Sequence, residues 1–220
     1  MVVLATKIYV RGEARSRTLD SLTSLVDNDL GELDVEYTVG LRDDGFPSVT
    51  ISGDDAPAAR ALLTAEWGAI TPHRSDGEVY VGTLESWDDD GFVLDAGEQV
   101  RISADEFGLG PGDPAQIRTR FGLVQHVPLR FVAGETPRLA DTERDRLYGW
   151  RRGPDRVNVN SATRAEVRAT VNRAGHADDI VTVERLGLLE QSIVCRDETD
   201  APGLLASIGP YLPSELLAVV

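Results

Sequence analysis

Apolar and polar positions along residues 1–72 follow two periodicities. Alternation with period two predicts strands, and apolar residues three or four positions apart predict helices. The expected order is strand–helix–strand–strand–helix, with strands at 3–10, 35–41 and 48–52 and helices at 17–26 and 56–67. This order is most of a ferredoxin-like pattern and lacks only the final strand. We therefore expect a small α+β unit over residues 1–72.

Residues 73–135 show a different pattern, in which Gly and Asp turns separate short strands. Ser103 and Glu106 have the spacing of a capping box, which predicts a short helix after the third strand. Five strands with a helix after the third are typical of an OB-fold, and an SH3-like barrel stays open as the alternative. The five expected strands cover residues 79–87, 92–94, 99–102, 115–120 and 125–132.

Residues 136–220 return to alternating helices and strands. We expect a helix at 141–150, a strand at 156–159, a helix opened by Thr163 and Glu166, a strand pair across Gly187 and a last helix near 203–208. The predicted fold class is therefore α+β, with a small β-barrel, OB/S1-like or SH3-like, flanked by two small ferredoxin-like units.

The barrel segment resembles the S1-type RNA-binding version of the OB-fold. The runs that carry the resemblance are GTLESW, GFVLDAG, EQVRISADEFGL and GDPAQIRTRF. The resemblance implies that Phe92 forms part of a base-stacking face and that Arg101 contacts phosphate or base. The further aromatic residue and the histidine of the usual binding face have no clear match in this chain. Phe92 fits a core position equally well, because successive residues of a strand face opposite sides.

The composition is acidic, with 37 Asp and Glu against 22 Lys and Arg, and Lys7 is the only lysine. Carboxylates hold water and cations tightly, so this balance predicts a protein adapted to molar salt. An acidic disordered chain is the alternative, but 41% hydrophobic residues favour a folded core. Nearly the whole chain also resembles an archaeal family of unassigned function that is common in haloarchaea, most clearly over residues 149–167 and 179–213. That resemblance transfers no activity.

Positive charge is concentrated in one stretch. Residues 114–173 contain 12 Arg against 6 acidic residues, in a chain of net charge −15. Guanidinium groups form paired hydrogen bonds with phosphate, and bases stack on aromatic rings. We therefore expect a binding surface for RNA or an RNA-containing complex of transcription or translation. The predicted surface comprises Arg118, Arg120 and Arg130 on the last barrel strands, followed by Trp150, Arg151, Arg152, Arg156, Asn158 and Asn160. In the alternative, the same arginines dock an acidic protein partner, or they pair with carboxylates inside the chain.

Motifs for catalysis are absent from the sequence. His73, His126 and His176 lack metal-ligand spacing, and the glycines of 108–112 follow a predicted helix, so they do not form a phosphate-binding loop. Cys195 stands alone in an apolar stretch and is expected to be a core thiol. We expect a non-enzymatic protein without cofactor or metal, and a small-molecule enzyme is a weaker alternative. No run has membrane-spanning length and the N-terminus alternates like a strand, so we expect a cytoplasmic protein.

Overall fold

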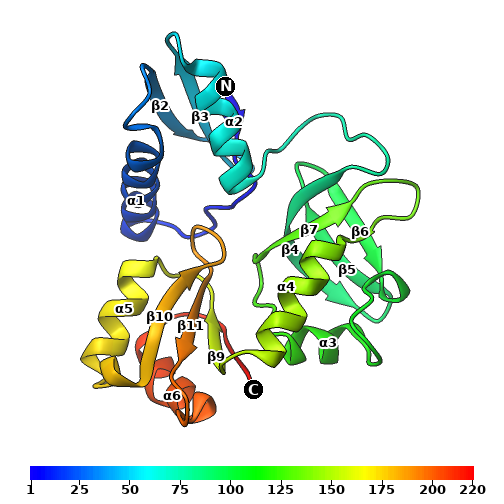
Figure 1. Cartoon of the computed structure of the whole chain (residues 1–220), viewed down its shortest axis with the longest axis vertical. Helices are drawn as coiled ribbons and strands as arrows, with labels where there is room; N and C mark the ends of the chain where they lie inside the picture. Colours follow the sequence, from blue (N-terminus) through cyan, green and yellow to red (C-terminus); the bar gives the residue numbers. More distant parts are fainter.

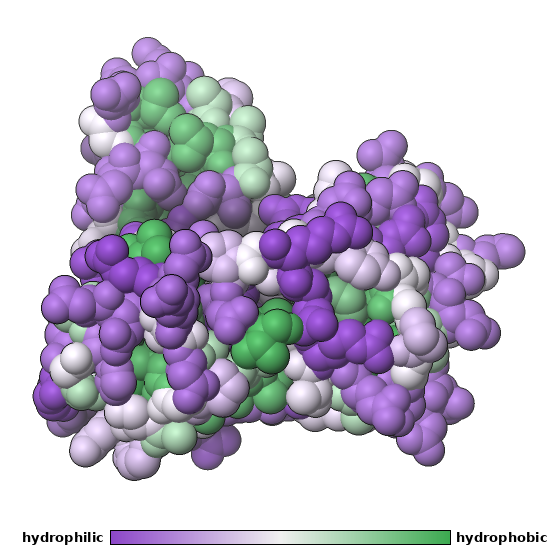
Figure 2. Space-filling model, turned by 60° about the horizontal axis from the view of Figure 1, so that its bottom comes forward, coloured by the Kyte–Doolittle hydropathy of each residue, from purple (hydrophilic) through white to green (hydrophobic).

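The computed structural model describes residues 1–220, which form three α+β units, each built on its own antiparallel sheet (Figure 1). Six α-helices accompany the three sheets, so the predicted α+β class is confirmed. None of these helices combines the length and the apolar character that crossing a bilayer requires. In the view of Figure 2, hydrophilic side chains cover most of the surface, and apolar side chains gather in a few small areas.

The N-terminal unit has a three-stranded sheet of order β1-β3-β2. Its elements are β1 (Val2–Val3), α1 (Glu13–Leu30), β2 (Glu36–Leu41), β3 (Pro47–Ser52) and α2 (Ala56–Trp67). Leu22, Val26 and Leu30 lie four residues apart on α1 and are buried, because this spacing places them on one helix face. The strand expected at 3–10 is confined to Val2–Val3. Beyond it, Lys7 bonds to Glu85 of the central unit and Tyr9 to Glu190 of the C-terminal unit.

The central unit has a five-stranded sheet of order β6-β5-β4-β7-β8, which curls into half of a barrel (Figure 1). Its elements are β4 (Val79–Asp88), β5 (Gly91–Asp95), β6 (Gln99–Ser103), α3 (Pro114–Arg120), β7 (Pro128–Val132) and β8 (Arg138–Leu139). Strand β6 shows the alternation that the sequence predicts, since Val100 and Ile102 are buried and their neighbours are exposed.

The strand expected at 115–120 is wrong, because these residues form helix α3. Asp113 caps the helix: its side chain accepts a hydrogen bond from the Gln116 amide at 2.8 Å, and the Gln116 side chain accepts one from the Asp113 amide at 3.2 Å. Pro114 in the first turn suits a helix start. Ile117 and Phe121, four residues apart, are both buried in the central core. The predicted helix after Ser103 is only a single 3₁₀ turn without a side-chain cap.

The C-terminal unit has a four-stranded sheet of order β10-β11-β9-β12. Its elements are β9 (Arg156–Val159), α5 (Arg164–Arg173), β10 (Ile180–Arg185), β11 (Gln191–Cys195), α6 (Ala201–Ile208) and β12 (Leu216–Val219). The capping box of Thr163 and Glu166 is confirmed. Cys195 is a buried core thiol, and burial raises its pKa to about 11.

Helix α4 (Asp141–Arg152) packs on the central unit, whereas the sequence pattern assigned it to the C-terminal one. Leu147 and Trp150 on this helix belong to the same hydrophobic cluster as the strands of the half-barrel. Strand β8, which precedes α4, pairs with β7 through Phe131 and Leu139. The central packing unit therefore extends beyond residue 135.

Two apolar side chains of the C-terminal unit are inserted into the cores of its neighbours. Leu188, in the loop between β10 and β11, belongs to the hydrophobic cluster of the N-terminal unit. Its amide donates a hydrogen bond to Thr6 Oγ1 at 3.0 Å. Val219, at the end of β12, packs in the core of the central unit. Through these two side chains, the C-terminal unit packs into the cores of both other units.

Replacing Leu188 with Ala should lower the free energy of unfolding by about 3 kcal/mol, because it leaves a cavity in the N-terminal core. Leu62→Ala is the matched control, since Leu62 is exposed on α2, and it should change stability by less than about 0.5 kcal/mol. Urea denaturation followed by circular dichroism measures both changes. Equal losses in the two variants would show that Leu188 does not anchor the N-terminal unit.

Candidate functional site

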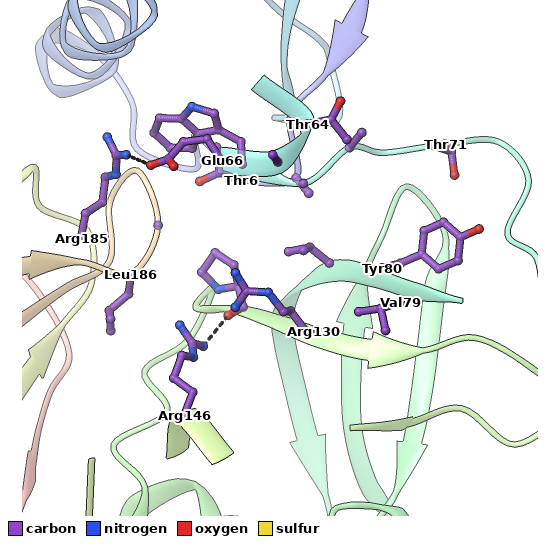
Figure 3. A pocket seen from close by; sticks show the side chains of 18 residues that line it. Thr6, Thr64, Glu66, Thr71, Val79, Tyr80, Arg130, Arg146, Arg185 and Leu186 are labelled. Carbon is purple, nitrogen blue, oxygen red and sulfur yellow. Dashed lines mark hydrogen bonds and ion pairs between the residues drawn. The ribbon is translucent and has the colours of Figure 1, made fainter. Parts of the chain in front are cut away.

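A cleft lies where the three units meet, and its cavity volume is about 500 Å³ (Figure 3). The N-terminal unit lines it with Thr6, the end of α2 from Thr64 to Trp67, and Gly68 and Ala69 after the helix. The central unit contributes the start of β4, two residues of β7 and one of α4, and the C-terminal unit contributes the end of β10 and the start of the loop after it. Cavities between domains are common ligand sites, so this cleft is the first candidate for function.

Two arginines of the cleft share one carboxylate. Glu143 on α4 is fully buried and accepts hydrogen bonds from the Arg130 amide at 3.2 Å and from Arg146 Nε at 2.9 Å. Arg130 Nη1 lies 3.4 Å from the same carboxylate. Arg146 also donates to the Pro128 carbonyl at 3.1 Å. Because one carboxylate balances two guanidinium groups, one positive charge remains uncompensated at this wall of the cleft.

The remaining walls supply a further guanidinium, hydroxyl groups and an aromatic ring. Arg185 forms an ion pair with Glu66, and its guanidinium lies 4.4 Å from the centre of the Trp67 ring. Tyr80 lies on the opposite side of the cleft from Arg185 (Figure 3), and its hydroxyl accepts a hydrogen bond from the Ser75 amide at 2.9 Å. The cleft therefore combines groups that bind anions with one ring that is only partly buried.

Glu190 has a fully buried carboxyl group and belongs to the loop between β10 and β11, whose first residues line the cleft. Glu190 Oε1 accepts a hydrogen bond from the Tyr9 hydroxyl at 2.7 Å, and Glu190 Oε2 has no hydrogen-bond partner. Burial raises the pKa of Glu190 to about 8. The pKa of Tyr9 is raised as well, first by burial and then by the nearby Glu190. At neutral pH we therefore expect Glu190 to carry a proton.

The residues that the S1 resemblance implies are not a free binding face. Phe92 is 0% exposed and its ring stacks on Phe107 at 4.0 Å between ring centres, so it cannot stack on a base. Arg101 is exposed, but two hydrogen bonds of 2.7 and 2.8 Å tie its guanidinium to Asp88. Phe92 therefore has the core position that the sequence left open.

Trp150, Asn158 and Asn160 are buried as well. Asn158 donates to the Gly122 carbonyl at 2.8 Å and Asn160 to the Gln125 carbonyl at 3.1 Å, so both amides join the C-terminal unit to the central one. Trp150 lies in the central core. None of the three is available to an RNA base.

Most of the predicted arginines also bind within the chain. Arg118 pairs with Glu215 and lies 3.8 Å from the centre of the Trp87 ring, and Arg156 pairs with Glu184 at 3.1 Å. Arg118 and Arg120 lie on helix α3, where a barrel strand was expected. The other contacts are those of Arg120 with the carbonyls of Leu109 and Pro111, of Arg151 with the carbonyl of Val220, and of Arg152 with the Tyr148 ring. Of the predicted surface, Arg130 alone lines the cleft.

The cleft also contains residues that the sequence did not single out. Arg146 belongs to the arginine-rich stretch, so its charge was visible but its position was not. Arg185 and Tyr80 lie far from each other and from Arg146 in the sequence and carry no motif. Only the packing of the three units brings these side chains together.

Family models match nearly every residue. The DUF2110 N-terminal domain matches residues 1–73, the DUF2110 central domain matches 74–151 and the DUF2110 C-terminal domain matches 154–220. The chain belongs to the DUF2110 family. A comparison with curated proteins found no match. The central domain of this family ends at the last turn of α4, which agrees with the packing of that helix on the half-barrel. The archaeal origin expected from the sequence stays a prediction.

The raised pKa of Glu190 makes stability depend on pH. The folded state keeps the proton that the unfolded chain releases near pH 4.5, so this group stabilises the fold fully below pH 4.5, and its contribution is lost as the pH rises to about 8. Within that window it should remove about 1.4 kcal/mol of unfolding free energy per pH unit. Glu190→Gln should abolish this component.

Urea titrations from pH 5 to pH 9 measure the effect as the difference between wild type and Glu190→Gln. The exposed Glu78→Gln is the matched control and should follow the wild-type curve. A Glu190→Gln variant that keeps the wild-type pH dependence would contradict the buried, protonated carboxyl group.

Proposed function

We propose that this DUF2110 protein is a non-enzymatic binding protein for RNA, or for an RNA-containing complex, and that a single strand occupies the cleft between the three units. The observation that carries the proposal is the pair of guanidinium groups, from Arg130 and Arg146, that face the cleft over one buried carboxylate. In a chain of net charge −15, this local surplus of positive charge favours an anionic ligand.

The cleft suits a phosphate-bearing strand better than a compact apolar ligand. Arg130 has a half-exposed side chain, and a planar guanidinium can hold two phosphate oxygens at once. Tyr80 offers a ring against which a base can stack, and stacking accepts any base. The hydroxyl groups of Thr64 and Thr71 line the same cavity and can bind ribose. These groups come from more than one unit, so the proposed site requires the assembled protein.

The topology of the central unit supports an OB-like assignment, which is part of the proposal. Counted within the unit, the sheet order β6-β5-β4-β7-β8 is third, second, first, fourth and fifth strand, with α3 between the third and the fourth. OB-folds are five-stranded Greek-key barrels that bind oligonucleotides. The strand–helix–strand–strand–helix–strand order of the C-terminal unit supports a ferredoxin-like assignment, and the N-terminal unit has the same order without the last strand.

An adaptor that docks acidic protein segments is the competing function. The surplus charge of Arg130 and Arg146 would also attract carboxylates, and rim charges act mainly on the rate of association. The two functions predict different effects of losing the Tyr80 ring. The ring should contribute to RNA binding by stacking on a base, whereas it should not contribute to binding of an acidic peptide.

Fluorescence anisotropy with a labelled single-stranded RNA tests the proposal. Arg130→Gln should weaken binding about tenfold and reduce the slope of affinity against salt concentration by about 0.7, because one phosphate contact is lost. Tyr80→Leu should weaken binding at all salt concentrations, since stacking is insensitive to salt. Arg168→Gln is the matched control, because Arg168 is exposed on α5 and lies outside the cleft.

The competing function is tested in the same assay with polyglutamate as a competitor. Displacement of the RNA by polyglutamate, together with wild-type affinity in Tyr80→Leu, would favour the adaptor. Equal losses in Arg130→Gln and Arg168→Gln, or no RNA binding, would contradict the proposal.

A further inference from the structure

A second cavity, of about 450 Å³, lies between the N-terminal and central units, beside the segment 7–11 that precedes α1. Its walls carry six side chains with acid–base or ionic chemistry that the cleft does not use. These are Lys7, Tyr9, Arg11, Arg15, Glu85 and His126. Asp43 and Asp44, in the turn between β2 and β3, complete its rim.

Glu85 fixes the protonation pattern of His126. Lys7 Nζ lies 2.9 Å from Glu85 Oε1, and His126 Nδ1 lies 3.2 Å from the same oxygen. Burial would raise the pKa of Glu85, but the hydrogen bonds from His126 and Lys7 hold it at about 2. An ionised carboxylate only accepts hydrogen bonds, so His126 Nδ1 must carry the proton. In neutral His126, the lone pair is then on Nε2.

The imidazole of His126 is held rigidly in this orientation. Its ring packs against the Tyr9 ring, tilted by 31° and with 3.9 Å between ring centres. His126 also has a left-handed backbone with φ of 69°, which is uncommon outside glycine. Strained residues of this kind persist where the surrounding structure fixes them, often at binding sites. No protein group forms a hydrogen bond with His126 Nε2, whereas in His176 both ring nitrogens are bonded, to Asp179 and Ser207.

Two arginines provide the anion-binding part of the cavity. Arg11 and Arg15 are exposed, and neither side chain forms an ion pair or a hydrogen bond within the chain. The other charges are already paired: Lys7 with Glu85 and Asp95, and Asp44 with Arg42. The charges around the cavity balance once Arg42 and Asp95 are counted, but Arg11 and Arg15 are its two positive groups without a partner, and the guanidinium fork matches phosphate oxygens.

We infer that this cavity binds a small phosphorylated alcohol, such as a sugar phosphate, with the phosphate between Arg11 and Arg15 and a hydroxyl group donating a hydrogen bond to His126 Nε2. A dianionic phosphate matches two guanidinium groups better than a single carboxylate does. The carboxylates of Asp43 and Asp44 can accept hydrogen bonds from further hydroxyl groups. The inference is independent of RNA binding, because none of these residues lines the cleft.

Nuclear magnetic resonance on the full-length protein tests the inference, because the chain has three histidines. Long-range ¹H–¹⁵N spectra should show His126 protonated at Nδ1. Titration with ribose 5-phosphate should shift the His126 ring signals in a saturable way and leave His73 and His176 unchanged. Inorganic phosphate, which lacks the alcohol carbon chain, should bind about tenfold more weakly.

Two variants separate the phosphate contact from the hydroxyl contact. The double variant Arg11→Gln, Arg15→Gln should lose ribose 5-phosphate affinity about tenfold or more, and the matched control Arg168→Gln, Arg173→Gln, two exposed arginines of α5, should keep it. His126→Asn, followed through the amide signals of residues 7–11, should reduce the affinity to that of inorganic phosphate, since Asn tolerates the left-handed backbone. His126 protonated at Nε2, equal binding of the two probes, or equal losses in the two double variants would overturn the inference.

Discussion

The ion pairs of Lys7 are the interaction on which the rest of the structure depends. Lys7 is the only lysine in the chain, and it contacts Glu85 at 2.9 Å and Asp95 at 2.7 Å, both in the central unit. Burial lowers the pKa of Lys7, but its hydrogen bonds with Asp95 and Glu85 outweigh this effect, so its pKa lies above the ordinary value. The charged form is therefore the stable one. Thr6 lines the cleft, and Lys7 and Ile8 line the second cavity, so this contact lies between the two.

The arginines explain how an acidic chain can contain such a concentrated basic stretch. Arg118, Arg130 and Arg156 each pair with a carboxylate, and others bind backbone carbonyls or aromatic rings. Burial lowers the pKa of Arg118 to about 10, which shows how far this guanidinium is removed from water. Within the stretch, Arg118 and Arg151 join the central unit to the C-terminal one, and most of the other arginines are bound within their own unit. The positive charge of this stretch that remains for a ligand is small and lies in the cleft, at Arg130 and Arg146. Adaptation to molar salt stays a prediction.

Sequence patterns predicted what is decided locally. The helix expected at 17–26 lies within α1, the helix expected at 56–67 is α2, and the capping box of Thr163 is present, because each follows from spacing within a few residues. The error at 115–120 has the same origin, because the local cap of Asp113 and Gln116 outweighs the alternating pattern of the residues that follow it. The candidate sites depend on contacts far apart in the sequence. The Arg118 pair with Glu215 spans 97 residues and the Tyr9 bond to Glu190 spans 181, so charge counts could not reveal which arginines are free.

The most direct test of this account is the reactivity of the Lys7 amine in the native, full-length protein. Acetylation followed by mass spectrometry of peptides compares it with the same amine in denaturant, and the exposed α-amino group of Met1 serves as an internal reference. Because Lys7 is clamped between two carboxylates, its acetylation should be about a hundredfold slower in the native protein, while the Met1 amine reacts at similar rates in both states. Native Lys7 that reacts as fast as it does in denaturant would contradict the central role of this contact.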